Sequence, residues 1–134
     1  MQTFLPFSDF QKSVEVLDYR RLGKQRVETF QVLNILLNRT ESKGWTNHPV
    51  TKMWRGFEEA LKLYQNITIT EWVKRGYKNN MSFENVNKDN LIFPTWLGDE
   101  EFHRSHRSNL LRKNFEYYSQ YFNEPIDLEY KWVI

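Results

Sequence analysis

Mostly apolar residues recur every three or four positions in the middle of the chain. They are Val50, Trp54, Phe57, Leu61, Tyr64, Thr68 and Trp72. This spacing is that of one face of an α-helix, so it predicts an amphipathic helix over residues 50–75. Lys74 and Arg75 then fall where cations favour the helix dipole, and Gly76 suits the position just after a helix end.

Two further helical segments are expected on either side of Gly23. Ser8 and Asp9 offer an N-cap for a helix over residues 9–19. A second stretch over 24–38 carries a stripe of apolar residues that we expect in the core: Val27, Phe30, Leu33 and Leu37. Because glycine weakens a helix, we expect an interruption or kink at Gly23.

The end of the chain predicts one more helix. Asp99 is the expected N-cap of a helix over residues 100–122. Residues 1–7 and 123–134 read as extended segments packed on the body. With no repeat or linker, the whole pattern predicts an all-α fold: a compact single domain over residues 1–134, with three main helices and extended N- and C-terminal segments.

Composition excludes several classes of protein. The 134 residues contain no cysteine, which excludes disulfide scaffolds, thiol catalysis and cysteine-ligated metals. A mean hydropathy of −0.74 and the lack of a long apolar run exclude a transmembrane span. We therefore expect a cytoplasmic monomer with no membrane contact, no cofactor and no metal.

Positive charge is concentrated in two blocks that contain no acidic residue. The first, within residues 20–26, holds Arg20, Arg21, Lys24 and Arg26. The second, within residues 103–113, holds His103, Arg104, His106, Arg107, Arg112 and Lys113. In a chain of net charge +2, such blocks favour a local polyanion site, and we expect them to converge on one groove. The alternative is two solvated helix faces, with ordinary ion pairs to Asp18 and Glu28.

The three histidines suggest a site rather than a metal centre. His103 and His106 are three residues apart and could share a metal, but no carboxylate follows in the pattern of zinc proteases. Contact with phosphates or base edges is therefore the favoured interpretation. His48 lies near Trp45 and Asn47 in a loop, where it could form a pocket wall.

Three stretches, in chain order, resemble the pyrimidine dimer DNA glycosylases of the phage endonuclease V type. Residues 17–22, Leu-Asp-Tyr-Arg-Arg-Leu, are similar to the first-helix motif of that family. Residues 54–77 resemble its second helix with the Lys-Arg-Gly-aromatic end, and residues 101–122 resemble its last helix and aromatic terminus. The resemblance covers most of the chain and departs from the family around residues 78–93.

This resemblance implies a repair enzyme that cuts the N-glycosidic bond of a damaged pyrimidine in double-stranded DNA without a metal. In the family, the N-terminal amine attacks the sugar C1′ and forms a Schiff base, after which the strand can be cleaved. A nearby carboxylate stabilises the developing sugar cation, and arginines hold the bent backbone. An amine that is partly neutral near pH 7 is a competent nucleophile.

Two departures from the family pattern decide the candidate residues. The family amine belongs to a small residue exposed by loss of Met, whereas this chain begins Met1-Gln2, so we expect the amine of Met1 to be the nucleophile. The family glutamate follows the Tyr-Arg pair, where this chain has Arg21 after Arg20. Glu28 or Asp18 would then supply the carboxylate.

The leading interpretation is thus a DNA N-glycosylase, with or without AP-lyase activity, acting on damaged or modified pyrimidines. The cations of both blocks would hold phosphates, and His48, His103 and His106 would line the site. A non-catalytic DNA-binding module with the same basic face is the alternative. A metal-dependent nuclease using His103 and His106 is a third possibility.

Overall fold

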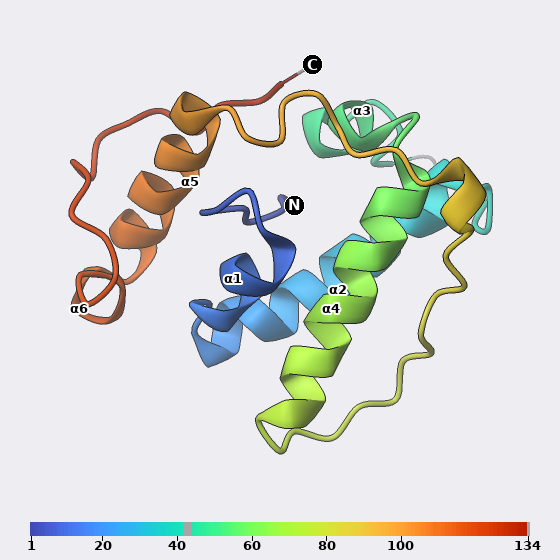
Figure 1. Ribbon diagram of the computed structural model, residues 1–134, viewed down its shortest axis with the longest axis horizontal. Coiled ribbons are helices and arrows are strands. Elements are labelled where there is room, and N and C mark those ends of the chain that lie inside the picture. Colours follow the sequence, from blue (N-terminus) through green and yellow to red (C-terminus); the bar gives the residue numbers. More distant parts are fainter. Residues whose placement is uncertain (42–43, 134) are drawn as a thin grey trace.

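The computed structural model describes residues 1–41 and 44–133, which form helices joined by irregular segments (Figure 1). The elements are α1 (Phe10–Glu15), α2 (Tyr19–Leu36), α3 (Pro49–Trp54), α4 (Glu58–Lys74), the 3-10 turn η1 (Lys88–Asn90), α5 (Glu100–Lys113) and α6 (Phe115–Tyr118). No strand occurs in this part of the chain, so the expected all-α fold is confirmed. None of the helices described is long and apolar enough to cross a bilayer.

α2 is continuous through Gly23, so the predicted interruption at this residue is wrong. The glycine instead allows α4 to approach closely. A Cβ atom at Gly23 would lie 3.2 Å from two ring carbons of Trp72, tighter than an ordinary van der Waals contact. The missing side chain therefore serves the packing of α2 against α4.

The chain breaks before α2 instead, because α1 ends at Glu15 rather than near residue 19. Arg75, just after α4, donates hydrogen bonds to the carbonyl oxygens of Leu17 (2.7 Å), Glu15 (3.1 Å) and Val14 (3.2 Å). Helix ends leave carbonyl groups without intrahelical partners, and here a distant side chain satisfies them. Local sequence alone could not reveal this helix end.

The helix predicted over residues 50–75 is two helices, α3 and α4, separated at Gly56. This glycine has φ of 91°, a left-handed conformation that a side chain would strain. At the far end the expectation is confirmed. Gly76 has φ of 89°, and its amide donates to the Val73 carbonyl (2.9 Å). The Tyr77 amide donates to the Trp72 carbonyl (3.3 Å), which completes a Schellman motif.

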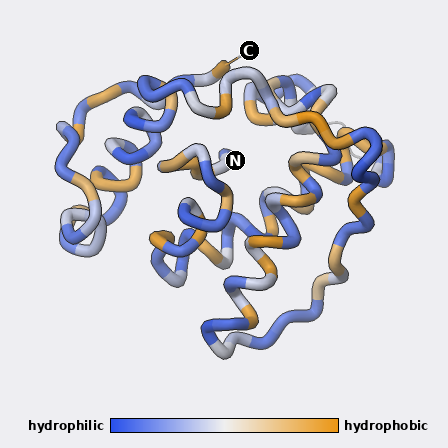
Figure 2. The backbone as a smooth tube through the Cα atoms, viewed as in Figure 1, coloured by the Kyte–Doolittle hydropathy of each residue, from blue (hydrophilic) through white to orange (hydrophobic). Residues whose placement is uncertain are grey.

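α5 begins as predicted but ends early. The carboxylate of Asp99 accepts a hydrogen bond from the Glu101 amide (3.1 Å) at its start. After Lys113 the chain leaves the helix at Asn114, whose side chain caps α6 by accepting from the Tyr117 amide (3.2 Å). The connection from α4 to α5 begins as a largely hydrophilic stretch (Figure 2), and the C-terminal tail runs irregularly along α5 (Figure 1).

The buried face of α2 differs from the predicted stripe. Val27 is 42% exposed and Phe30 is 36% exposed, whereas Leu33 is buried as expected. The buried residues of this helix are Leu22, Gln25, Thr29, Val32 and Leu33. Two of these five are polar: Gln25 bonds to the backbone of another segment, whereas the buried hydroxyl of Thr29 has no hydrogen-bond partner among the described residues.

That backbone is the N-terminal segment, which lies at the centre of the molecule (Figure 1). Residues 3–6 are buried and belong to no helix. Side chains satisfy their backbone groups: Gln25 Oε1 accepts from the Phe4 amide (2.5 Å), the Tyr64 hydroxyl donates to the Phe4 carbonyl (2.9 Å), and His106 Nδ1 accepts from the Leu5 amide (2.9 Å). Because buried backbone groups without partners are costly, these bonds fix the path of the segment.

The burial of His106 predicts acid sensitivity. Burial, with a smaller contribution from the charge of His103, holds the pKa of His106 well below its ordinary value. The unfolded chain therefore binds a proton below about pH 6.5 that the folded state does not, and the free energy of unfolding falls as the pH drops from 7.5 to 5. Each such histidine contributes at most about 1.4 kcal/mol per pH unit to this slope.

Denaturant unfolding of the wild type and of His106→Asn measures this slope. The asparagine can still accept from the Leu5 amide but does not titrate, so its unfolding free energy should depend less steeply on pH. Equal slopes for the two proteins would show that His106 does not cause the acid sensitivity.

Candidate active site

A cleft of about 420 Å³ opens where the chain begins. We name it the N-terminal cleft, and it is lined by Met1, Gln2, Phe4, Arg20, Arg21, Lys24, Glu28 and Lys113. The predicted nucleophile and one of the two predicted carboxylates therefore lie in the same cavity. Four cationic side chains surround them.

Two residues of α2 hold the start of the chain against this helix. The backbone amide of Gln2 donates to Glu28 Oε2 (3.0 Å), and Gln25 Nε2 donates to the Gln2 carbonyl (3.0 Å). The Glu28 carboxylate thus lies one residue from the terminal amine of Met1. This proximity is built into the fold, because Glu28 and Gln25 lie about one helical turn apart.

α5 closes the cleft from the other side. The Gln2 side chain donates to Asn109 Oδ1 (3.2 Å), and Lys113 comes from the last turn of the same helix. Burial, followed by the charges of Arg21 and Lys24, lowers the pKa of Lys113, while Glu28 opposes the shift. Positive charge therefore exceeds negative charge within the cleft, which suits a polyanionic ligand.

His48 lies close to the same groups. Its Nδ1 accepts from the Val50 amide (3.1 Å) at the start of α3, and its ring packs edge-on against Trp45 and Trp132, with centroids 5.1 and 5.5 Å away. Burial and then the charge of the chain's N-terminus lower the pKa of His48, and the charge of Glu28 opposes them. His48 is not among the residues that line the N-terminal cleft, so its place in the wall of the site stays a prediction.

Asp18, the other predicted carboxylate, is not among the residues that line the cleft. It accepts a short hydrogen bond from the Tyr118 hydroxyl and an ion pair from Arg21 (3.3 Å), while its own amide donates to Tyr118 Oη (3.0 Å). Burial and this contact raise the pKa of Tyr118 well above its usual value. Asp18 therefore joins α6 to α2, and the geometry favours Glu28 as the carboxylate of the site.

A comparison with protein families finds one matching family model. The family model of the pyrimidine dimer DNA glycosylases matches residues 1–85. The chain belongs to this family. No curated protein and no solved structure matches it. The matched part includes Met1, Glu28 and the cations of α2, whereas Lys113 lies beyond it. The chain is thus a member of a DNA glycosylase family.

The two histidines of the second basic block point inward, away from any DNA surface. His103 is 2% exposed, with Nδ1 donating to the Leu5 carbonyl (2.7 Å) and Nε2 accepting from the Gly98 amide (2.9 Å). His106 is fully buried and holds the Leu5 amide. Their predicted contact with DNA does not fit this geometry, because both rings support the N-terminal segment. In the described chain no group of three potential metal ligands occurs.

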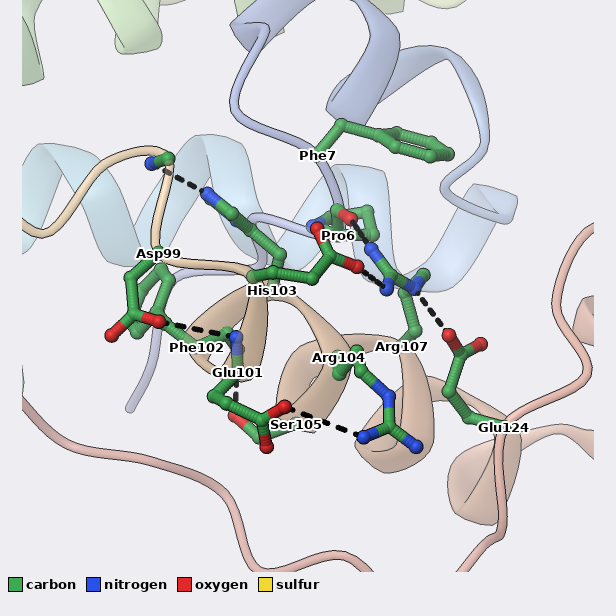
Figure 3. Close-up of polar contacts among 12 residues, drawn as sticks. Pro6, Phe7, Asp99, Glu101, Phe102, His103, Arg104, Ser105, Arg107 and Glu124 are labelled. Carbon is green, nitrogen blue, oxygen red and sulfur yellow. Dashed lines mark hydrogen bonds and ion pairs between the residues drawn. The ribbon is translucent and has the colours of Figure 1, made fainter.

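Arg107 also points inward (Figure 3). It is 9% exposed, donates to the Pro6 carbonyl (2.8 Å), and forms ion pairs with Glu124 (2.8 Å) and Glu100. Arg104, one turn earlier, forms an exposed pair with Glu101 (3.5 Å) and no other ion pair within the described residues. Of these two arginines, only Arg104 remains accessible to a phosphate.

Two further predicted cations, Arg112 and Arg26, also contact other parts of the protein. Arg112 donates to the carbonyls of Ile126 (2.6 Å) and Leu128 (2.7 Å), so it holds the C-terminal tail. Arg26 donates to Asn79 (2.9 Å) and lies over the ring of Trp72, 4.8 Å from its centroid. The predicted convergence of the two blocks is therefore partial, since only Lys113 of the second block reaches the N-terminal cleft.

Sequence reasoning missed two positioning residues, Gln25 and Asn109. Gln25 is fully buried, and Asn109 is partly buried. One signal was available for Gln25, because it lies one turn before Thr29 and beside Leu22 on the face that faces the core. A polar side chain at such a position indicates a backbone partner, here Phe4 and Gln2.

Substitution distinguishes the roles of Arg104 and Arg107 in α5. Arg107→Met should lower the free energy of unfolding by about 3 kcal/mol, because it leaves Glu124 and the Pro6 carbonyl without their partner in a buried place. Arg104→Met, the matched control, should change it by less than about 0.5 kcal/mol, as expected for an exposed pair. Denaturant unfolding of both variants measures this, and equal effects would contradict the assignment.

Proposed function

We propose that the protein is a DNA N-glycosylase that removes damaged or modified pyrimidines from duplex DNA, with the Met1 amine as nucleophile. The observation that carries this proposal is the hydrogen bond from the Gln2 amide to Glu28 (3.0 Å), which keeps a carboxylate beside the terminal amine in a cationic cleft. The family assignment supports the reaction class, and the geometry supports these two groups within it.

The chemistry follows from the charges of these two groups. The neutral amine attacks C1′ of the sugar, the N-glycosidic bond breaks, and its electron pair leaves with the base, which takes up a proton. The sugar carries positive charge in this transition state, and the Glu28 carboxylate stabilises it. Loss of a proton from the attached nitrogen and opening of the sugar ring give a Schiff base, from which β-elimination of the 3′ phosphate is the proposed lyase step.

The cations of the cleft would hold the phosphates on either side of the reacting sugar. Arg20 and Lys24 lie one turn apart on α2, with Arg21 beside them, and Lys113 faces them from α5. Guanidinium groups grip phosphates with two parallel hydrogen bonds, and ammonium groups act as point charges. Such contacts favour a distorted duplex, since an enzyme must expose C1′ to reach it.

A non-catalytic DNA-binding module with the same cationic cleft is the second candidate. The excess of cations over carboxylates in the cleft is the observation that favours it. Such a module would bind duplex DNA in a salt-dependent manner but would release no base. Covalent trapping distinguishes the two functions.

Borohydride treatment during reaction with a duplex that contains a thymine dimer should link protein and DNA covalently. Reduction fixes the Schiff base as a stable amine, and peptide mass spectrometry should find the sugar remnant on Met1. A chain that carries an extra N-terminal residue should give no adduct. An adduct on Lys113 instead would contradict the choice of nucleophile, and the absence of any adduct or base release would favour the binding module.

The two carboxylates offer matched controls for this experiment. Glu28→Gln should reduce base release by at least about 100-fold while DNA binding persists, because it removes only the charge that stabilises the sugar cation. Asp18→Asn should retain base release once its stability has been checked, since Asp18 does not line the cleft and its carboxylate accepts from the Tyr118 hydroxyl. The reverse result would assign the catalytic role to Asp18.

The cationic side chains predict the salt dependence of binding. Lys24→Ala and Lys113→Ala should each reduce the slope of log K against log salt concentration by about 0.9, as expected when one phosphate contact is lost. Fluorescence anisotropy at several salt concentrations measures the slope. Lys12→Ala, which changes an exposed lysine of α1 that does not line the cleft, is the control and should leave the slope unchanged.

A further inference from the structure

The base that leaves in the proposed reaction takes up a proton, and few groups in the N-terminal cleft can supply one. Among the described residues that line it, the two arginines do not lose their proton in proteins, and the Met1 amine must be neutral to attack. Glu28 accepts a hydrogen bond from the Gln2 amide (3.0 Å), and its proposed role requires the charged carboxylate. The two lysines, Lys24 and Lys113, are the remaining sources of a proton.

These two lysines lie on different walls of the cleft. Lys24 belongs to α2, the helix that holds the start of the chain by a hydrogen bond from Gln25 Nε2 to the Gln2 carbonyl (3.0 Å). Lys113 comes from the last turn of α5, on the other side. A nucleophile attacks C1′ from the face opposite the bond that breaks, so a base displaced by an amine held on α2 leaves toward the α5 wall.

The Lys113 ammonium is available to a ligand. Arg107 and Arg112 of the same helix bond to carbonyl groups of the protein, whereas no hydrogen bond or ion pair joins Lys113 Nζ to another described residue. Burial, followed by the charges of Arg21 and Lys24, lowers the pKa of Lys113 and makes it a stronger acid than an ordinary lysine. An ammonium has three N–H donors, so contact with a phosphate leaves others for the base.

We propose that Lys113 is the general acid of base release and donates its proton to the departing pyrimidine. The inference rests on the proposed function. As the Met1 nitrogen bonds to C1′, the bond from C1′ to the base breaks and its electron pair moves onto the base. The proton passes from Lys113 Nζ to the carbonyl oxygen beside the departing ring nitrogen, and the neutral lysine then regains a proton from water. A positioned general acid accelerates such a step by about 100-fold or more.

Borohydride trapping on two duplexes of one sequence tests this role. One duplex carries a thymine dimer, and the other carries an abasic site, from which no base has to leave. Lys113→Arg keeps the positive charge but does not give up its proton, so trapping on the dimer duplex should slow by about 100-fold. Trapping on the abasic duplex should change by less than about threefold, because the nucleophile and the phosphate contacts remain. Lys24→Ala, which removes one phosphate contact, should slow both reactions by the same factor at subsaturating protein.

The pH profile gives a second readout. Base release by the wild type should fall at alkaline pH as Lys113 loses its proton, and in Lys113→Arg this fall should move to higher pH. Equal slowing on the two duplexes, no slowing on the dimer duplex, or an unchanged alkaline fall would overturn the role of Lys113 as the acid. The outcome is separable from the proposed function: a wild type that releases no base would remove that function. Normal base release by the wild type with any of those three results would remove only the general acid.

Discussion

The buried N-terminal segment is the constraint on which the rest of this structure depends. An extended segment inside an all-α protein has no neighbouring strand to satisfy its backbone, so side chains must do so. Gln25 from α2, Tyr64 from α4, His106 from α5 and Tyr130 from the tail each bond a backbone group between Thr3 and Leu5. These elements are thereby tied together through the segment, and its first residue emerges at a fixed place beside Glu28.

A tethered terminus changes what the Met1 amine can do. On a free tail, a terminal amine samples many positions, and ordering it during the reaction costs conformational entropy. Here the following residues are buried, and the Gln2 amide, carbonyl and side chain are each bonded, to Glu28, Gln25 and Asn109. Most of that entropy is lost on folding, so the Met1 amine proposed as the nucleophile is already ordered beside the cleft before a substrate binds.

Much of the helical fold could be predicted from the sequence, because periodicity and end signals are local. The Asp99 cap and the Gly76 Schellman motif are confirmed for this reason. The carbonyl groups at the break after Glu15 are bonded by Arg75, and Gly23 allows the close approach of Trp72, both distant in sequence. The candidate site shows the same division. A spacing of four puts Arg20, Lys24 and Glu28 on one face of α2, which is a local property. The charge pattern could not show that Arg107 lies inside and donates to the buried Pro6 carbonyl.

The division of labour proposed along α2 has a simple geometric origin. Side chains three or four residues apart lie on the same face of a helix. Successive turns of one straight helix can therefore present different chemical groups on that face. Cations on the first turns and a carboxylate at Glu28 follow the order of a phosphate and a sugar within one nucleotide. Because the same helix also holds the N-terminal segment through Gln25, the proposed nucleophile and the cleft side chains of α2 share one rigid support.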